Sequence, residues 1–487
     1  MLRRGLIGYL PVNVVQAVAG FGAIVLFTRL LSPADYGAYA LGFSVMSLVH
    51  TCLFTWIESA MARFYVAEGE AGERGRMLAT LYSTWVAMAL ALPVVGGAIL
   101  FLLPAPPNLK LALAAGLAAI LGRSVLKLEQ ERRRAAGEVA RFAAVDMLQT
   151  GGGFVLGAGL TVLGWGGAGP LAGIGIASAM LAVFSFPQDI RRAGQGAFDP
   201  SRLRRYLGYG LPISLSLVLS LVLATTDRVV LAAYLNEAAV GAYHAGYSLS
   251  NRTLDVMFIW LGMAGGPAAV AALERGGEVA LRRTALDQAR LMALIAIPAA
   301  VGLALVARPL SELMVGKALA VEAGQVTPWI AVSALFSGAT TYYFHTAFTL
   351  ARRTRLMFVA MSIPALANLV LVLALVPRFG LAGAMWATTA SYGLGLVASV
   401  VLGRRALALP IPWATLAKVG AATAGMALVV LSVPGTGGVW ELAARSVSGA
   451  IAYAVLVLVL DAGGARSKTA EALRWLKHRR IGAGATA

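Results

Sequence analysis

Long apolar stretches alternate with short polar breaks along almost the whole chain. Most are close to 20 residues or longer, the length that a helix needs to cross the hydrocarbon core of a bilayer. The pattern predicts about fourteen spans. Six are expected in the first half, at residues 5–31, 35–64, 76–103, 109–129, 139–163 and 170–187. Eight are expected after it, at residues 206–235, 239–273, 284–306, 325–351, 356–376, 380–403, 413–433 and 442–460.

A polar turn after the first span has a second copy after the seventh. Residues 31–44 (LSPADYGAYALGFS) align without gaps with residues 235–248 (LNEAAVGAYHAGYS) and share seven of fourteen positions. The sixth and twelfth spans also open alike, which favours a parallel duplication. The pattern therefore predicts an all-α polytopic membrane protein with two pseudo-symmetric six-helix lobes and two extra helices. The expected segments are a lobe at 1–190, a connector at 191–205, a lobe at 206–405, a helix pair at 406–462 and a basic tail at 463–487.

Composition supports an integral membrane protein. Hydrophobic residues make up 59% of the 487 residues and charged residues only 13%, with a mean hydropathy of +0.78. The single cysteine, Cys52, excludes an intramolecular disulfide and a cysteine metal cluster. The net charge of +18 would indicate a nucleic-acid partner in a soluble protein. In a membrane protein, the first question is on which side of the membrane the charged residues lie.

The basic residues favour one side of the predicted membrane. If both termini are cytoplasmic, most Arg and Lys residues fall in inside segments, as the positive-inside rule requires. The outside loops hold only Arg29, Lys110, Arg308, Lys317, Arg378 and Arg445. The charge excess is thus explained by topology and by attraction to anionic membrane lipids, and no nucleic-acid partner is expected. The tail at residues 466–480 (RSKTAEALRWLKHRR) is expected to form a basic helix on the inner leaflet.

Three sequence segments resemble a known family. These are TRLLSPADYGAYALG after the first span, DRVVLAAYL followed by GAY in the seventh and eighth, and RFGLAGAMWATTASYG at the twelfth. They are similar to the polysaccharide-transporter branch of the multidrug/oligosaccharidyl-lipid/polysaccharide exporter superfamily. The resemblance covers nearly the whole chain, and its motifs mark the fold rather than the substrate.

The resemblance implies a flippase that moves a polyprenyl-pyrophosphate-linked oligosaccharide across the bacterial inner membrane. Such a protein needs a water-filled cavity, cations for the phosphates and a groove for the lipid tail, with two lobes that open the cavity to each side in turn. A polysaccharide polymerase and a chain-length regulator are candidate partners. The alternative within the superfamily is a cation-coupled drug antiporter, a branch that usually has twelve spans.

Charges inside the spans are the candidate ligands of the substrate headgroup. Arg252, near the middle of the eighth span, is the leading candidate, and Arg228 in the seventh is second. Arg123 and Arg63 lie towards the inner ends of their spans, where snorkelling to the interface is an equal alternative.

Four carboxylates, Asp227, Asp255, Glu58 and Asp146, are candidates for a coupling proton or cation. The alternative is that they neutralise neighbouring arginines.

The remaining chemistry is sparse. His50, His244 and His345 fit hydrogen-bonded packing better than a proton relay, and their spacing matches no metal motif. There is no Walker motif, no GxSxG elbow and no DxD pair. We therefore expect no catalytic residue, no metal and no cofactor. A membrane-embedded polymerase or glycosyltransferase is the third and weakest alternative.

Overall fold

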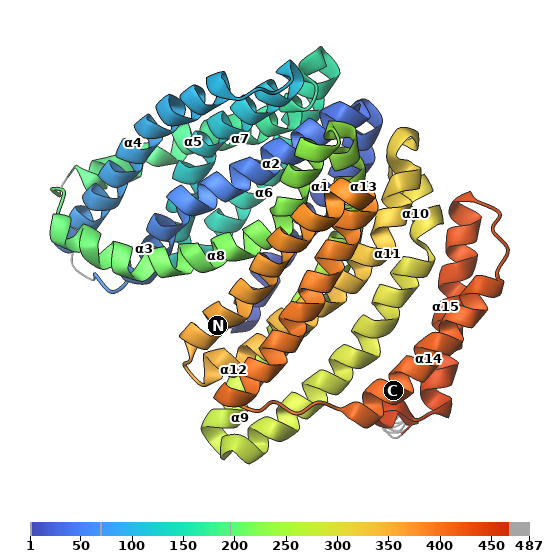
Figure 1. Cartoon of the computed structure of the whole chain (residues 1–487). Coiled ribbons are helices and arrows are strands. Elements are labelled where there is room, and N and C mark those ends of the chain that lie inside the picture. The colour runs from blue at the N-terminus through green and yellow to red at the C-terminus, as the bar shows by residue number, and fades with distance from the viewer. Residues whose placement is uncertain (1, 69–70, 195, 467–487) are drawn as a thin grey trace, which may run out of the picture. The chain divides into compact units, whose positions relative to one another are not determined.

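The computed structural model describes residues 2–68, 71–194 and 196–466 (Figure 1). Every regular element in this part of the chain is a helix, which confirms the all-α fold class. Nearly all of the predicted basic tail helix lies outside the described residues. The chain divides into two compact units. Unit 1 contains Met1–Ser248, Met314–Ala323 and Ala365–Thr388, and unit 2 contains Leu249–Leu313, Gly324–Pro364 and Thr389–Ala487.

The first part of the chain supplies most helices of unit 1. They are α1 (Leu2–Leu30), α2 (Pro33–Leu53), α3 (Thr55–Phe64), α4 (Ala71–Leu102), α5 (Pro107–Ala135), α6 (Val139–Leu160), α7 (Ala168–Ala193) and α8 (Pro200–Tyr234). A π-helical turn at Thr161–Trp165 follows α6.

The rest of the chain forms longer helices, some of which contribute to both units. They are α9 (Glu237–Leu305), α10 (Ala307–Met314), α11 (Lys317–Ala339), α12 (His345–Leu350), α13 (Thr354–Ala406), α14 (Trp413–Ser432) and α15 (Gly438–Val459). A second π-helical turn, Thr340–Phe344, joins α11 to α12.

The predicted number of spans agrees with the helices. Eleven helices of the described chain are long and apolar enough to cross a membrane, and Ala168–Phe184 is a shorter apolar helix. Two of the eleven, α9 and α13, each contain an internal turn and supply two spans, which makes thirteen spans. The shorter apolar helix is the fourteenth. The protein is therefore a multi-pass membrane protein.

The internal turns of α9 and α13 fall at glycines. Gly277 has φ 63° and Gly380 has φ 57°, a left-handed conformation that other residues rarely adopt. The sequence predicted short loops between these spans. In the structure each loop is reduced to a tight turn at the glycine, with helical residues on both sides of it.

Polar residues set the start of two helices. Ser32 precedes α2 and accepts a hydrogen bond from the Asp35 backbone N–H at 3.1 Å, with Pro33 as the first helical residue. Asp199 precedes α8 in the same way, and its carboxylate accepts from the backbone N–H of Ser201 at 2.9 Å. Both prolines lack the N–H that a first-turn residue would leave unpaired.

Two sequence predictions of element boundaries need correction. The second span, expected as one helix over 35–64, is interrupted at Phe54 between α2 and α3. The connector expected at 191–205 is largely helical, because α7 continues to Ala193 and α8 begins at Pro200. The two compact units are not the predicted lobes, and the lobe boundaries stay a prediction.

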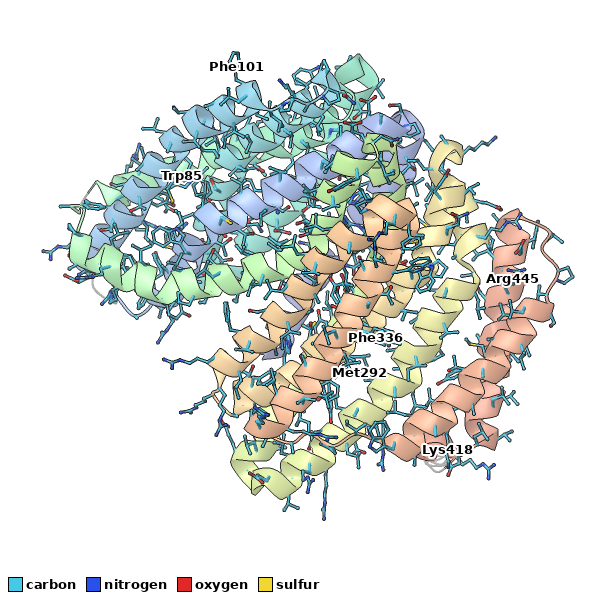
Figure 2. The ribbon with its side chains drawn as sticks, viewed as in Figure 1. Trp85, Phe101, Met292, Phe336, Lys418 and Arg445 are labelled. Carbon is cyan, nitrogen blue, oxygen red and sulfur yellow. The ribbon has the colours of Figure 1, made fainter. Side chains whose placement is uncertain are left out.

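In unit 1, α7 packs along both α5 and α6, and α5 also packs against α2 (Figure 1). The core of unit 1 contains both small and large apolar side chains, such as Ala38, Met46 and Ile57, all fully buried. The outward face of α4 is apolar as well. Phe101 is 84% exposed there and points away from the bundle (Figure 2), as expected for a lipid-facing residue.

Candidate functional site

Unit 1 contains a charged cavity of about 340 Å³. Three helices line it, α3, α5 and α8. The lining residues are Thr55, Glu58, Ser59, Ala62, Arg63, Glu131, Arg134, Tyr209 and Ile213. Charged side chains at membrane depth are costly and serve binding or conduction by default.

On each of the three helices, the lining residues share one face, which forms one wall of the cavity. On α3 the lining positions recur at intervals of three and four residues, which is one face of a helix. On α5, Glu131 and Arg134 are three residues apart and form an ion pair of 2.5 Å. Tyr209 and Ile213 are four residues apart on α8. The cavity therefore presents two arginines and two glutamates from neighbouring helices.

Of the predicted residues, Glu58 and Arg63 lie in this cavity. Arg63 is exposed, and its guanidinium lies 6.0 Å from the Phe64 ring. Glu58 is 9% exposed, and its Oε1 lies 2.9 Å from His50 Nε2.

The sequence analysis missed Glu131 and Arg134 as site residues. It ended the fourth span at Glu129 and placed the following charges in a loop, whereas α5 continues to Ala135. The signal that could have found them is the Glu131-to-Arg134 spacing of an ordinary helical ion pair.

A second charged group, around Asp146, lies elsewhere in unit 1. The buried Asp146 carboxylate accepts a hydrogen bond from Gln16 Nε2 at 2.7 Å and lies 3.7 Å from Lys127 Nζ. Arg123, which is half-buried, is close enough to both Asp146 and Glu58 for a Coulombic interaction. Among the described residues Arg123 has no ion pair within 4 Å. The sequence could not anticipate Gln16, because it comes from α1, 130 positions away.

Among the described residues Asp227 and Arg228 form no ion pair within 4 Å, although the Arg228 charge attracts the Asp227 carboxylate. Fully buried Asp227 accepts hydrogen bonds from Tyr243 Oη at 2.5 Å and Thr388 Oγ1 at 2.7 Å. Neighbouring residues of a helix point in different directions, so the two side chains have separate partners.

Arg228 is also buried, at 4% exposure. Its guanidinium lies 4.6 Å from the centroid of the Tyr247 ring, and its Nη1 donates to the Ala224 carbonyl at 2.5 Å. A cation above an aromatic face is attracted by the ring quadrupole. Within the described chain this guanidinium makes no ion pair.

Arg252 and Asp255 belong to unit 2. Arg252 is exposed and makes no ion pair with a described residue. Asp255 is half-buried and accepts a hydrogen bond from Asn251 Nδ2 at 2.5 Å. Arg252 influences this carboxylate through space without contacting it.

The other histidines have packing partners. His244 lies 5.7 Å from Tyr36 and 6.1 Å from Tyr39, ring centroid to centroid. His345 Nε2 lies 3.3 Å from Ser399 Oγ. Within the described residues no group of three or more His, Cys, Asp or Glu is arranged to hold a metal ion.

Unit 2 contains an apolar pocket of about 360 Å³. It lies between the second arm of α9, α11, the end of α13 and the start of α14, and Met292 and Phe336 are two of its residues (Figure 2). The other lining side chains are also apolar or aromatic, among them Phe258, Leu396 and Trp413. Such a pocket suits a hydrocarbon ligand.

The many apolar spans, all helical in the described residues, define a polytopic all-α membrane protein with a charged cavity in unit 1. The family model described as polysaccharide biosynthesis protein matches residues 26–321, more than half of the chain. The chain therefore belongs to this family. A search of curated protein sequences finds no match.

Solved structures show the fold. The lipid II flippase MurJ in an inward closed conformation matches with a TM-score of 0.78 at 14% identity, over 93% of this chain and 98% of that one. An inward-facing multidrug resistance transporter of the MATE family matches with a TM-score of 0.67 at 14% identity, over 80% and 94%. A transporter from Pyrococcus furiosus matches with a TM-score of 0.54 at 15% identity, over 82% and 92%. The last two are described as members of the MOP superfamily. These matches show that the chain shares its fold with the exporter superfamily that its sequence resembles.

Proposed function

We propose that this protein is a flippase that moves a polyprenyl-pyrophosphate-linked oligosaccharide from the inner to the outer leaflet of a bacterial cytoplasmic membrane. The observation that carries the proposal is membership in a polysaccharide biosynthesis family by a chain with an exporter fold. Sugars and phosphates cannot cross hydrocarbon unaided, so a polysaccharide pathway that builds its units on a lipid needs a transporter of this kind.

The arginines supply the chemistry for a pyrophosphate. In the proposal Arg63 binds the headgroup through charge-assisted hydrogen bonds, together with Arg134, which exchanges its Glu131 partner for a phosphate oxygen. Arg123, which has no ion pair with a described residue, stabilises the negative charge at longer range. Arg252 and Arg228 are proposed as further ligands, since neither is neutralised by a described carboxylate within 4 Å.

Four carboxylates within the spans are proposed to hold the coupling proton or cation, or to pair with the arginines during transport. They are Asp227, Asp255, Glu58 and Asp146. Asp227 already accepts two hydroxyl hydrogen bonds. An anion at this depth needs such donors, or a cation, to offset its desolvation.

The apolar pocket of unit 2 is proposed to hold part of the polyprenyl tail. Its lining of Met292, Phe336 and other apolar side chains offers a hydrocarbon chain dispersion contacts and no polar competitor. Transport is proposed to proceed by alternating access. The termini are proposed to be cytoplasmic, with a polymerase and a chain-length regulator acting on the product.

Depletion of the protein in its own cells tests the function. Lipid-linked glycan is labelled, and spheroplasts are treated with a membrane-impermeant glycosidase that reaches only the outer leaflet. We expect intact intermediates to accumulate in a protected form. Re-expression of the wild-type chain should restore cleavage.

Two other results would overturn the proposal. Intermediates that are cleavable but unpolymerised would place the protein after the flipping step, as a polymerase or glycosyltransferase. Normal glycan in drug-sensitive cells would favour the antiporter, which the MATE match keeps as the second candidate.

A further inference from the structure

One face of α5 carries a row of charged residues that connects the charged cavity with the group around Asp146. The row, called the α5 row below, consists of Arg123, Lys127, Glu131 and Arg134. Because successive residues of an α-helix turn by about 100°, these four lie within an arc of about 80° and extend for about 16 Å along the helix. Glu131 and Arg134 line the cavity, so the same face continues beyond it with Lys127 and then Arg123.

Charge interactions between helices link the two ends of the row. Glu131 interacts with Lys127, one turn away on the same helix, and with Glu58 across the cavity. Arg123 interacts with Glu58 and also with Asp146 of α6. The cavity and the Asp146 group are therefore two parts of one charged path along α5. Charges at membrane depth serve binding or conduction by default.

The three cations of the α5 row differ in how closely a carboxylate compensates them. Arg134 has an oxygen of Glu131 at 2.5 Å. Lys127 Nζ lies 3.7 Å from Asp146 Oδ1, an ion pair beyond ordinary hydrogen-bond distance. Arg123 forms no ion pair within 4 Å among the described residues. Because Coulombic attraction weakens with distance, the compensation of positive charge decreases along the row from Arg134 to Arg123.

Asp146 can release Lys127 because a second donor remains. Gln16 Nε2 donates to the other carboxylate oxygen, Oδ2, at 2.7 Å. The Asp146 side chain is 6% exposed, and a carboxylate at this burial needs such a donor to offset its desolvation. Lys127 is 30% exposed, and its ammonium group has three N–H donors. The ammonium group is therefore available to an anion that enters from the cavity.

We propose that Lys127 is a further ligand of the substrate's diphosphate, between Arg134 and Arg123. This role rests on the proposed function and deepens it. A phosphate that displaces Glu131 from Arg134 meets a less compensated cation at each step along the α5 row. Side chains four residues apart have Cβ atoms about 5–6 Å apart, so Lys127 and Arg123 can hold the two phosphate groups of one diphosphate together. A monophosphate engages only one of them.

Binding of short prenyl phosphates to the full-length protein in detergent tests the proposal. The probes are farnesyl diphosphate, farnesyl monophosphate and inorganic diphosphate, and isothermal titration calorimetry gives each affinity. We expect the wild type to bind farnesyl diphosphate most tightly. Lys127→Gln should bind it at least about tenfold more weakly, the effect of one lost charge-assisted hydrogen bond, and should lose most of the preference over the monophosphate. Lys127→Arg keeps the charge and should bind close to the wild type.

A second variant should change the affinity in the opposite direction. Asp146→Asn removes the charge that competes for Lys127 and keeps an acceptor for Gln16, so farnesyl diphosphate should bind more tightly. A purely structural role of Lys127 would give no such increase. The matched control is Lys110→Gln, near the start of the same helix and about 25 Å along it from Lys127, which should bind like the wild type. Thermal unfolding of each variant checks that folded proteins are compared.

Wild-type affinity in Lys127→Gln, or no gain in Asp146→Asn, would overturn the role of Lys127 and leave the flippase assignment in place. Asp146→Asn decides the question if Lys127→Gln does not fold. Equal wild-type affinity for inorganic and farnesyl diphosphate would overturn the assignment of the row to a lipid headgroup, in favour of a free anion. A wild type that binds no diphosphate would instead contradict the proposed function itself. The two failures are therefore distinguishable.

Discussion

At the scale of single residues, Asp199 makes the first turn of α8 dependent on pH. Its pKa is lowered chiefly by the hydrogen bond from the Ser201 hydroxyl, and then by the backbone N–H groups of Arg202 and Ser201. A carboxyl whose pKa is lower in the folded state adds stability above its unfolded pKa of about 3.9. That stability is lost as the pH falls through the folded pKa.

We therefore expect the melting temperature of the wild-type protein to fall more steeply in acid than that of Asp199→Asn. Asparagine caps a helix about as well as aspartate but does not titrate. Thermal unfolding of both proteins from pH 7 down to pH 3 measures the difference. Parallel curves of melting temperature against pH would show that the cap has no role in acid stability. Asp199→Ala, which removes the cap, should be less stable than both proteins above pH 5.

Arg252 carries the transport prediction at this scale. Charge reversal in Arg252→Glu replaces a proposed phosphate ligand by a repelling carboxylate next to Asp255. Loss of one charge-assisted hydrogen bond costs about 1.5–3 kcal/mol, so glycan export should fall about tenfold or more, while membrane insertion stays normal. Surface glycan per cell, normalised to the amount of inserted protein, is the measurement.

The control for this variant is Arg404→Glu, at an exposed position near the end of α13. It reverses the same charge without touching a proposed ligand and should export normally. Wild-type export by Arg252→Glu would remove Arg252 from the site.

At the scale of helices, the two copies of the repeated motif contact each other in unit 1. A Cβ added at Gly37 would lie 1.7 Å from the Glu237 carbonyl oxygen, and one added at Gly241 would lie 2.6 Å from the Pro33 carbonyl oxygen. The start of α2 therefore packs directly on the start of α9. Backbone approach this close requires glycine on both helices.

Gly37→Ala should separate these two helices and destabilise the protein by about 1–3 kcal/mol, the usual cost of overpacking. Gly97→Ala is the matched control, because a Cβ there meets nothing within 4 Å. The control should be neutral or more stable by up to about 1 kcal/mol, as expected for Gly to Ala in a helix. Thermal unfolding in detergent compares them. Equal stability of the two variants would show that the crossing tolerates a methyl group.

The hydrophobic pattern was sufficient to predict the membrane spans but not which spans pack against each other. It predicted a turn after the first span and a copy after the seventh, because apolar length and polar breaks are local properties. The turns themselves are shorter than residues 31–44 and 235–248, since α2 begins at Pro33 and α9 at Glu237. It could not predict that Gly37 meets Glu237. The break at Phe54 was also out of reach, because no Gly or Pro marks it and the Ser214 hydroxyl that bonds the nearby Thr51 carbonyl comes from 163 positions away.

The same limit applies to the candidate site. Intramembrane charge singled out Glu58, Arg123 and Asp146 one by one. An uncharged partner such as Gln16, which donates to Asp146, carried no comparable signal in the sequence. Such groups become visible only when separate helices bring them together.

At the scale of the whole molecule, transport of a lipid-linked sugar makes two demands that differ in chemistry. The headgroup needs charge, and the charged cavity of unit 1 is the candidate for it. The tail needs apolar surface, and the pocket of unit 2 is the candidate for that. A drug antiporter could bind its substrate in a pocket of either kind, but that substrate would carry no long hydrocarbon chain. Blocking the apolar pocket therefore separates the two functions.

Ala339→Phe places a ring in the apolar pocket, which Ala339 lines from a half-buried position on α11. The open volume of about 360 Å³ should admit the ring with little loss of stability. If the pocket holds the polyprenyl tail, export of glycan should fall while the thermal stability stays near that of the wild type. Ala98→Phe, on the exposed face of α4, adds the same ring towards lipid and should leave export unchanged. Normal export by Ala339→Phe, in a variant that is stable and inserted, would mean that the tail travels outside this pocket.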